Sequence, residues 1–368
     1  MKKTLLIIAI IALAGLGIWQ HQNSQTSTTT SDKPVIKIGV SLPLTGDMAF
    51  AGHPVKKALE ISMRDMQKNN KLKYDYELIF EDDRLDSKTT LLNYNRLKSI
   101  NKINAIISMW GNAVVISEPA DRDGIIHFGC AWGYELGKGF YNFNHSTLPD
   151  EQIGKLIEGL KKHNVKKLGI IYNTTKGDYE LISFLKDKLK DTDIEIVFDN
   201  IFQAEQKDFK AEIIKMREKE TDAVLLFLIS PGMEIFMKQA NELNYHPKYT
   251  SINYFTYNPQ LFEGLWYVSD AAGTNEFREY FTQETNENSS NSCVSNLYSA
   301  LQILVDAFEK TDVAEGSVPT NKDVAQTILD MESRTDSTGK IYIDKEGNIH
   351  SNATLNIIKN GQPVLLEE

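Results

Sequence analysis

The segment from Val35 to Ala58 constrains the fold of this chain more than any other stretch of the sequence. It opens with a run of mainly β-branched residues, Val35 to Val40, which is typical of a buried strand. A turn cluster, Pro43 to Asp47, follows, and apolar residues then recur at helical spacing from Val55 to Met66. Strand, polar turn and helix in this order predict the first unit of a parallel α/β sheet, which binds ligands at the carboxyl ends of its strands.

The middle of the chain repeats this alternation of strands and helices. Runs rich in β-branched and aromatic residues predict strands, and amphipathic stretches between them predict helices. The predicted strands are 168–172, 194–198, 223–229 and 249–254, and the predicted helices are 150–163, 178–191, 207–219 and 232–244. The sequence therefore predicts a second α/β series of the same kind, and a length of 368 residues suffices for two cores.

The N-terminus has the pattern of an export signal. A short cationic head, Lys2-Lys3, precedes an apolar run from Leu5 to Trp19, and a polar stretch follows it. The run is shorter than the ~20 residues that span a bilayer comfortably. We expect residues 1–19 to be a cleaved signal peptide, with an uncleaved membrane anchor as the alternative, and residues 20–33 to be a flexible linker.

Charge and motif content argue against several classes of function. The formal net charge of −10 and the pI of about 5.3 make nucleic acid an unexpected partner. The seven histidines show no metal-ligand spacing, no G-x-S-x-G motif is present, and no nucleotide-binding glycine loop follows the first strand. Two short S-x-x-K matches, at Ser99 and Ser183, lie in predicted helices without companion motifs. We therefore expect no enzyme activity, no cofactor and no metal.

Two motifs give the chain a resemblance to a known family. They are Pro43-Leu44-Thr45-Gly46 with Ala49 and Gly52, and Thr338 to Asp344 with Gly347. The first matches the P-L-[ST]-G-x-x-A-x-x-G opening of the type I periplasmic binding proteins, and the second resembles their T-G-x-[IV]-x-F-[DN]-x-x-G closing segment. From about Val35 to Val364, the chain is similar to the leucine/isoleucine/valine-binding group of that family.

The resemblance implies an α/β fold of two Rossmann-like lobes with parallel central sheets, joined by three crossover strands. We expect lobe 1 to hold residues 34–144 plus 257–333, and lobe 2 to hold 145–256 plus 334–368. The implied function is a periplasmic or extracytoplasmic solute-binding protein that closes on a small amino-acid-like, carboxylate or amide ligand and delivers it to an ABC permease. The alternative is a membrane-tethered ligand sensor or envelope regulatory protein that has kept the fold.

The resemblance also implies ligand positions at the carboxyl ends of the strands. Two loops of lobe 1 are expected to hold a ligand carboxylate through hydroxyls and backbone N–H groups, although the hydroxyl positions here fall on residues without hydroxyls. The predicted ligand-binding residues are Phe50, Asn112, Ala113, Ala131, Trp132, Tyr179, Ser230 and Tyr254. The aromatic members suggest a partly apolar or ring-bearing ligand.

Tyr254 occupies the position at which amino acid binders of this family commonly have an acid for the ligand ammonium. A buried cation needs a charged or well-directed acceptor. The difference suggests a ligand without an amino group, or an acid supplied from elsewhere, such as Asp47 or Asp178.

Cys130 and Cys293 are the only cysteines in the chain. An exported protein can pair two such residues, but one pair is not a disulfide scaffold. Because both fall near the predicted cleft on different segments, we expect two unpaired thiols.

Overall fold

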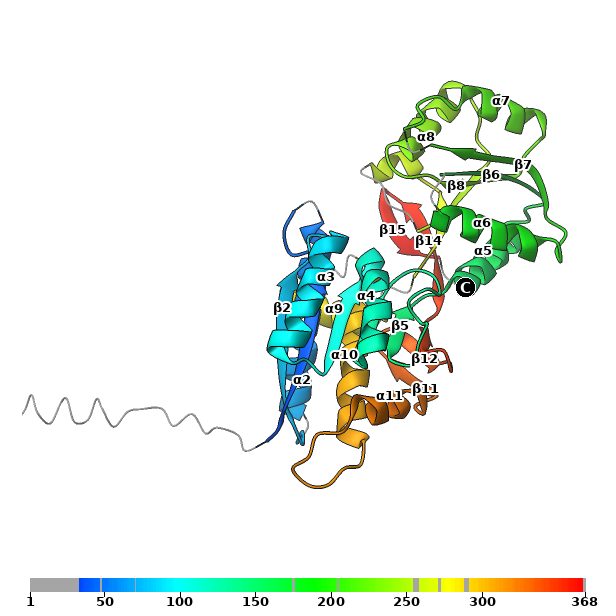
Figure 1. The fold of residues 1–368 in the computed structure, drawn as a ribbon. Coiled ribbons are helices and arrows are strands. Elements are labelled where there is room, and N and C mark those ends of the chain that lie inside the picture. The colour runs from blue at the N-terminus through cyan, green and yellow to red at the C-terminus, as the bar shows by residue number, and fades with distance from the viewer. Residues whose placement is uncertain are drawn as a thin grey trace, which may run out of the picture.

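Two lobes, each built on its own sheet, make up the computed structural model of the chain (Figure 1). The structure describes residues 33–46, 48–69, 71–173, 176–203, 205–253, 258–270, 273–287 and 291–366. Lobe 1 is the mainly blue, cyan and orange body in Figure 1, and lobe 2 is the mainly green body that also holds the red strands.

An eight-stranded sheet forms the centre of lobe 1, in the spatial order β11-β12-β13-β5-β4-β3-β1-β2. Its strands are β1 (Val35–Leu42), β2 (Asp75–Asp82), β3 (Ala105–Met109), β4 (Ile126–Cys130), β5 (Asn142–Ser146), β11 (Ser333–Asp336), β12 (Gly339–Ile343) and β13 (Asn348–His350). All neighbours from β13 to β2 are parallel, and β11 and β12 add an antiparallel edge. Strands β3 and β4 are buried along their whole length, as expected for a parallel sheet covered on both faces.

Helices cover both faces of this sheet. Ala105 and Ile107 of β3 point into the larger core, whereas Ile106 between them points into a smaller core on the opposite face. The larger core takes in the apolar sides of α2 and α10, and the smaller one is closed by α3, η1 and α4. The helices are α2 (Ala49–Asn69), α3 (Ser87–Arg96), the π-helical turn η1 (Leu97–Asn101), α4 (Trp110–Asp123), α9 (Asn275–Thr285), α10 (Ser292–Lys310) and α11 (Asn321–Leu329).

A seven-stranded sheet forms the centre of lobe 2, in the order β15-β14-β10-β9-β8-β6-β7. Its strands are β6 (Lys167–Asn173), β7 (Glu195–Phe202), β8 (Ala223–Phe227), β9 (Lys248–Ile252), β10 (Trp266–Asp270), β14 (Ala353–Lys359) and β15 (Gln362–Leu365). Strands β10 to β7 are parallel, and β14 and β15 are antiparallel. The accompanying helices are α5 (Pro149–Lys162), α6 (Lys176–Leu189), α7 (Lys210–Glu218), α8 (Gly232–Glu242) and the 3₁₀ turn η2 (Pro259–Phe262).

The chain passes between the two sheets three times, after Ser146, after Asp270 and after His350. The predicted α/β fold of two lobes joined by three crossings is therefore confirmed. The strand pairing differs from the predicted lobe boundaries at two places. The sequence predicts 257–333 for lobe 1 and 334–368 for lobe 2, whereas β10 pairs in the sheet of lobe 2 and β11 to β13 pair in that of lobe 1. These strands join partners far away in the sequence, so their local pattern does not tell which sheet they complete.

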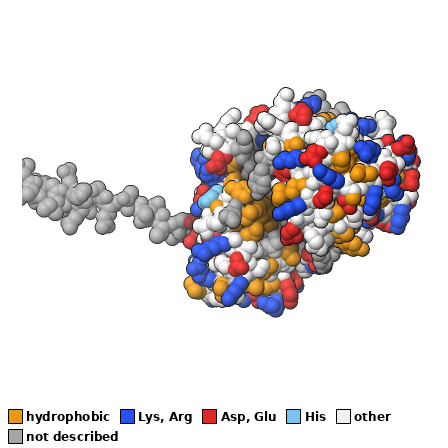
Figure 2. Space-filling view, turned by 90° about the horizontal axis from the view of Figure 1, so that it is seen from above, with side chains coloured by type: hydrophobic (Ala, Val, Ile, Leu, Met, Phe, Trp, Pro, Cys, Tyr) orange, Lys and Arg blue, Asp and Glu red, His pale blue; other side chains and the backbone are white. Residues whose placement is uncertain are grey.

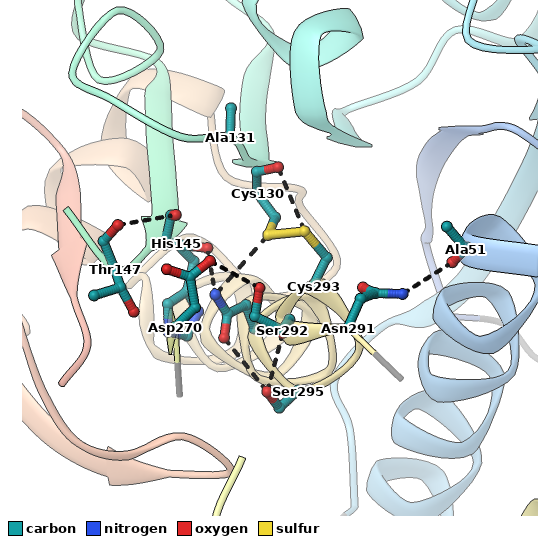
Figure 3. Close-up of a disulfide and its surroundings, with 12 residues drawn as sticks. Ala51, Cys130, Ala131, His145, Thr147, Asp270, Asn291, Ser292, Cys293 and Ser295 are labelled. Atoms are coloured by element: carbon teal, nitrogen blue, oxygen red, sulfur yellow. Dashed lines mark hydrogen bonds between the residues drawn. A yellow bond between two sulfur atoms is a disulfide. The ribbon is translucent and has the colours of Figure 1, made fainter. Parts of the chain in front are cut away.

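The prediction of two unpaired thiols is wrong. Cys130, at the end of β4, and Cys293, in the first turn of α10, form a disulfide with an S–S distance of 2.05 Å and a Cα–Cα distance of 5.6 Å (Figure 3). The two residues are 163 positions apart in the sequence. Helix α10 packs against β4 and β5, and this packing places its first turn beside the end of β4. The tertiary fold brings the two cysteines together, and their spacing in the sequence does not predict this.

Within the described part of the chain, none of the helices has the length and apolar character that a membrane crossing requires. The apolar run from Leu5 to Trp19 and the linker up to Asp32 lie outside the described residues. The prediction of a signal peptide or anchor therefore stays a prediction.

Candidate functional site

The candidate site lies at the carboxyl ends of the two parallel sheets. Loops leave these ends after β1 and β4 in lobe 1 and after β8 in lobe 2, while α4 begins directly after β3. Figure 1 shows lobe 2 above and beside the upper edge of lobe 1, where the loops of lobe 1 emerge. This edge of a parallel sheet suits a ligand because helix N-termini and free backbone groups meet there.

Asp82 anchors the first of these loops. Its carboxylate accepts hydrogen bonds from the backbone N–H groups of Leu44 at 2.8 Å and Thr45 at 3.2 Å. Burial opposes ionisation of the carboxyl, but these bonds and the Thr45 hydroxyl outweigh it and lower the pKa of Asp82. Gly52 fits beneath the same loop, since a Cβ there would lie 2.1 Å from the carbonyl oxygen of Pro43. The acidic turn after β2 and the P-L-T-G motif therefore form one structural unit.

Three of the residues predicted for lobe 1 differ sharply in exposure. Phe50 lies in the first turn of α2 and is 66% exposed. Asn112 and Ala113, in the first turn of α4, are buried. The Asn112 side chain lies beside the buried carboxyl of Asp83, and Ala113 packs on Ala131. In this conformation, only Phe50 of the three presents its side chain to solvent.

The loop after β4 is held by Asn144 of β5. The Asn144 Nδ2 donates to the carbonyl oxygens of Ala131 and Gly133, both at 2.9 Å, and its Oδ1 accepts the Ala131 N–H at 3.1 Å. The Ala131 N–H, which the sequence analysis offers to a ligand, is therefore bonded within the protein in this structure.

Trp132, the next residue in this loop, bridges the two lobes. Its half-buried indole packs against the apolar core of lobe 2. The indole Nε1–H donates to Oε1 of Gln152, a buried residue of α5, at 2.9 Å. The predicted site residue Trp132 thus joins the strand-end loop of lobe 1 to a helix of lobe 2.

On the side of lobe 2, the structure brings Tyr179 and Ser230 to the same edge of the sheet. Tyr179 lies in the first turns of α6 and is 58% exposed, while Ser230 follows β8 and is half-buried. Ile229, next to Ser230, is 52% exposed, and the sequence analysis does not single it out. The sequence feature that could have indicated Ile229 is its apolar side chain, which extends the apolar run of β8 beyond the last paired position of that strand.

Glu234 is a buried acid at this edge that the sequence analysis also misses. It lies in the first turn of α8, where the helix dipole favours a negative charge, and it accepts a hydrogen bond from the Ser230 hydroxyl at 2.7 Å. The predicted residue Tyr254 and the alternative acid Asp47 lie outside the described residues, as does the side chain of Asp178.

Large apolar side chains are thus exposed near the carboxyl ends of both sheets, Phe50 in lobe 1 and Tyr179 and Ile229 in lobe 2. Figure 2 shows hydrophobic side chains gathered in a hollowed area near the centre of the face seen from above. An apolar surface of this kind is suited to contact with an apolar or ring-bearing molecule.

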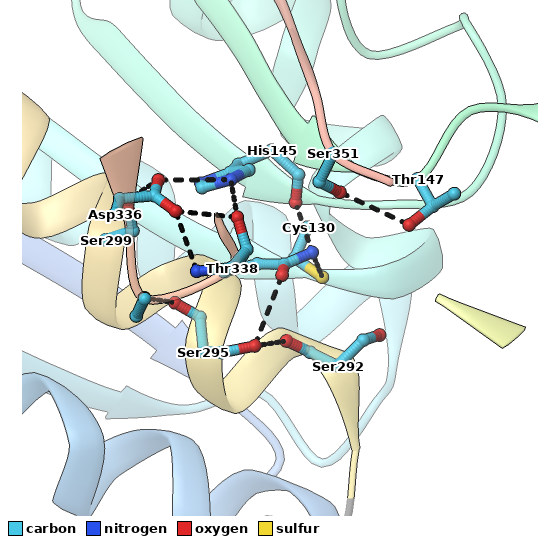
Figure 4. A network of polar contacts seen from close by, with 11 residues as sticks. Cys130, His145, Thr147, Ser292, Ser295, Ser299, Asp336, Thr338 and Ser351 are labelled. Atoms are coloured by element: carbon cyan, nitrogen blue, oxygen red, sulfur yellow. Dashed lines mark hydrogen bonds and ion pairs between the residues drawn. The ribbon is translucent and has the colours of Figure 1, made fainter. Parts of the chain in front are cut away.

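Polar contacts link the three crossings behind the cleft. At the second crossing, the Asp270 carboxylate accepts a hydrogen bond from Ser292 of α10 at 3.0 Å (Figure 3). It accepts another from Gln152 of α5 at 2.5 Å. Thr147 of the first crossing lies beside the same carboxyl, and its hydroxyl is 3.2 Å from that of Ser351 in the third crossing (Figure 4). The three connections between the lobes therefore share one network.

A buried ionisable pair supports α10 next to this network. His145 of β5 and Asp336 of β11 lie 3.7 Å apart with both side chains fully buried (Figure 4). Asn296 of α10 donates to the His145 carbonyl oxygen at 3.0 Å, and Ser299 donates to Asp336. Burial lowers the pKa of His145, although the charge of Asp336 opposes that effect. These contacts fix the helix that carries Cys293.

Comparison with protein families decides which family this arrangement represents. A family model described as periplasmic binding protein matches residues 35–361, nearly the whole described chain. The chain belongs to this family. Its curated relatives include the Leu/Ile/Val-binding protein homolog 8 of Brucella abortus, which is 23% identical over 226 residues. That match covers 58% of this periplasmic binding protein and 56% of its relative, so it spans little more than half of either chain.

Solved structures show the same fold. A leucine binding protein from Thermotoga maritima matches with a TM-score of 0.73 and 19% identity, covering 90% of this binding protein and 98% of its own chain. A solute binding protein from R. palustris in complex with benzoate matches with a TM-score of 0.72 and 17% identity, covering 90% and 95%. At these identities the likeness concerns the fold alone.

Membership of this family implies a periplasmic or extracytoplasmic location. Among the described residues of this binding protein, no group of three or more His, Cys, Asp or Glu side chains converges as a metal site would require. What the site offers chemically is hydrogen bonding, an uncapped helix N-terminus and apolar contact.

Proposed function

We propose that this periplasmic binding protein captures a small solute between its lobes and delivers it to an ABC-type permease. The observation that carries the proposal is the exposure of large apolar side chains near the carboxyl ends of both sheets, Phe50, Tyr179 and Ile229, which we assign to the two walls of the cleft. Closure over an apolar ligand would remove these side chains from water, which favours the closed form. The ligand shifts the equilibrium to the extent that it binds the closed form more tightly than the open one. No catalytic step is part of this proposal.

The proposed ligand has an apolar or ring-bearing body and a carboxylate or amide group. The first turn of α4 follows Met109, which supplies no side-chain cap, so the positive end of the helix dipole favours a carboxylate. A similar structure is a leucine binding protein and another holds benzoate. Both of these ligands have a carboxylate on an apolar body, which agrees with the proposed class.

The choice between an acid and an amino acid depends on the acidic partner that an ammonium group needs. Because Tyr254 occupies the position where the acid is expected, we propose a ligand without an amino group. Glu234 is the acid that an amino acid ligand would use instead, since it is buried beside Ser230 at the edge of lobe 2.

A thermal-shift screen tests this proposal with benzoate, other aromatic acids, primary amides, leucine and short peptides. Ligand at 100 times its Kd stabilises the folded protein by roughly 2.7 kcal/mol, so a true ligand raises the melting temperature clearly. We expect carboxylates or amides to do so and leucine to have little effect. A strong response to leucine would refute a ligand without an amino group, and Glu234→Gln would then test whether Glu234 receives the ammonium. No response to any compound of the panel would refute the proposed ligand class.

The N-terminal run Leu5 to Trp19 supports a second candidate function, a membrane-tethered sensor or envelope regulator. A cationic head followed by an apolar run serves equally as a cleaved signal or as an anchor. Mass spectrometry of the mature protein decides between them. A new N-terminus after about residue 19 in the soluble envelope fraction supports the transport role, and an intact Met1 in the membrane fraction supports the sensor.

A further inference from the structure

Asp270 is the last residue of β10, where the chain leaves lobe 2 for lobe 1. Its Oδ2 accepts a hydrogen bond from Ser292 Oγ at 3.0 Å (Figure 3). Its Oδ1 accepts one from Gln152 Nε2 at 2.5 Å. Gln152 belongs to α5 of lobe 2 and Ser292 begins α10 of lobe 1. One carboxylate therefore contacts elements of both lobes at the point where they join.

The partners of Gln152 fix the orientation of its amide. The Trp132 indole Nε1–H can only donate, so the Gln152 oxygen must face it, at 2.9 Å. An ionised carboxylate can only accept, so the Gln152 NH₂ group must face Asp270. Each neighbour alone would favour this orientation, and together they leave no alternative. In the flipped amide, the NH₂ group would face the indole N–H, so two donors would meet. The amide oxygen would face the carboxylate, so two acceptors would meet.

We propose that Asp270 is a positioning residue for the ligand cleft: its carboxylate orients the Gln152 amide, which holds the Trp132 indole across the junction of the lobes. The inference rests on the proposed function only in treating the loop after β4 as part of the ligand cleft. Trp132 follows the carboxyl end of β4 and packs on the core of lobe 2, so its orientation affects both the cleft wall and the relation of the lobes.

The same carboxyl group is connected to the other two crossings. Thr147 lies beside it and interacts with Ser351 through their hydroxyls at 3.2 Å. Thr147 and Ser351 are buried, and each lies directly after the last residue of a lobe 1 strand. A change in the charge of Asp270 therefore affects the contacts at the start of all three connections between the lobes.

Protonation provides a direct way to change this link. Asp270 keeps some exposure as a residue, but its carboxyl lies among protein atoms, and burial raises its pKa to about 6 despite the bonds from Ser292 and Gln152. Glu151 of α5 raises the same pKa through its charge, and Glu151 is itself bonded to His350. A neutral Asp270 makes a weaker bond to Gln152, since a charge-assisted bond is roughly twice as strong as a neutral one.

Other titratable groups of this region include Asp344, which is bonded to His350, and the buried pair His145 and Asp336 under α10. Tyr342, Tyr134 and Asp150 also lie near Glu151. Burial opposes the charged imidazole of His350, but Glu151 and Asp344 outweigh it and raise its pKa, so its titration must be separated from that of Asp270 by experiment. Replacing His350 with Gln removes the histidine titration and leaves Asp270 and Gln152 in place.

The test uses the protein labelled with ¹⁵N at the tryptophan indole nitrogens, so that Trp132 is one of four possible signals. The Trp132→Phe variant assigns its signal, and the spectra are recorded without ligand from about pH 5 to pH 8. We expect the Trp132 indole signal to shift with a midpoint near 6, the pKa of Asp270. This shift should vanish in Asp270→Asn and persist in His350→Gln. The exposed Asp312 gives the matched control, since Asp312→Asn should titrate like the wild type.

Two results would overturn the proposal. One is a Trp132 signal in the wild type that does not titrate near pH 6, and the other is a titration that persists in Asp270→Asn. If that variant does not fold, Gln152→Met decides, since it keeps the titrating carboxyl but removes the amide. The proposal requires that the Trp132 response is lost in Gln152→Met, and a retained response contradicts it.

A binding measurement then tests whether Asp270 affects ligand binding in the cleft. With benzoate as the probe, we expect Asp270→Asn to weaken binding about 3- to 10-fold at pH 7.5, which corresponds to about 0.7–1.4 kcal/mol. Unchanged benzoate affinity in this variant would contradict a role for Asp270 at the cleft. If the wild type does not bind benzoate, the proposed ligand class is in error for this compound, while the ligand-free indole titration still decides the role of Asp270.

Discussion

The imidazole of His350, at the end of the last strand of lobe 1, is 2.8 Å from the carboxylate of Glu151 in α5 of lobe 2. Its other ring nitrogen is 3.0 Å from Asp344, and the ring of Tyr342 stacks on it at 4.0 Å. Burial favours the neutral imidazole, but the two carboxylates outweigh that effect and raise the pKa of His350. A positive charge at His350 therefore stabilises a contact between the lobes.

This pair predicts a pH dependence of stability. Since folding raises the pKa of His350, its stabilising effect is complete below the unfolded pKa of about 6.5 and disappears as pH rises through the higher folded value. We expect His350→Gln to lower the free energy of unfolding by roughly 1.5–3 kcal/mol near pH 6 and by much less near pH 9. Melting temperatures of both proteins at the two pH values check this, and an equal loss at both would contradict it.

Asp270 predicts a second pH effect at lower pH. Because burial raises its pKa to about 6, this group adds stability below its unfolded pKa, and that stability is lost as pH rises through about 6. Relative to Asp270→Asn, the wild type should gain on the order of 3 kcal/mol of stability between pH 8 and pH 4. Denaturant unfolding of both proteins across this range measures the difference. A difference that does not vary with pH would show that the carboxyl titrates in the usual range.

The disulfide predicts a response to reductant. Removing a native disulfide costs about 2–4 kcal/mol, and the bond between Cys130 and Cys293 closes a loop over 163 residues. We expect reduction to lower the melting temperature of lobe 1 by several degrees. Since the chain has no other cysteine, the Cys130→Ala/Cys293→Ala double variant is a clean control that should melt at the reduced value with or without reductant. An identical melting temperature for the oxidised and reduced wild type would argue against the bond.

Gly52 predicts a steric effect on the first loop of the cleft. A Cβ there would lie 2.1 Å from the Pro43 carbonyl oxygen, so Gly52→Ala must displace the loop and should cost about 1–3 kcal/mol. The matched control is Gly154 of α5, where a Cβ meets nothing within 4 Å. Because alanine is the better helix former by up to about 1 kcal/mol, Gly154→Ala should be neutral or stabilising. Equal effects of the two changes would refute the role of the close approach.

The exposed cleft residues predict a loss of affinity without a loss of stability. Burying an aromatic side chain contributes about 1.5–3 kcal/mol, so Phe50→Ser and Tyr179→Ser should each weaken a ligand found in the screen by 10-fold or more. Both side chains are exposed without ligand, and the melting temperature of the free protein should hardly change. Ile100→Ser replaces an exposed apolar residue on η1 as a control and should leave binding intact. A similar loss in all three variants would contradict the assignment of Phe50 and Tyr179 to the site.

The features that depend on local pattern could be predicted from the sequence. The run from Val35 becomes β1, and the helical spacing from Val55 becomes part of α2. The predicted helix 150–163 corresponds to α5 within one residue at each end. These elements follow from hydrophobic period and turn chemistry, which are properties of neighbouring residues.

The features that depend on distant contacts could not be predicted in the same way. The sequence gives no sign that β10 completes the sheet of lobe 2, or that Cys130 meets Cys293. For the site, it predicts Phe50 and Tyr179, which are exposed, but it does not indicate the internal bonds that engage Ala131 and Trp132. Those bonds come from Asn144 and Gln152, which lie on other elements and are brought close only by the fold.

The last three strands of lobe 1 and the last two of lobe 2 all lie between Ser333 and Leu365. When α11 has just been synthesised, the sheet of neither lobe is therefore complete. The sheet of each lobe keeps an unpaired edge until this final stretch is synthesised and adds its strands to both sheets. The two halves are thus expected to mature together at the end of translocation, and stopping the chain a few dozen residues early should impair both at once.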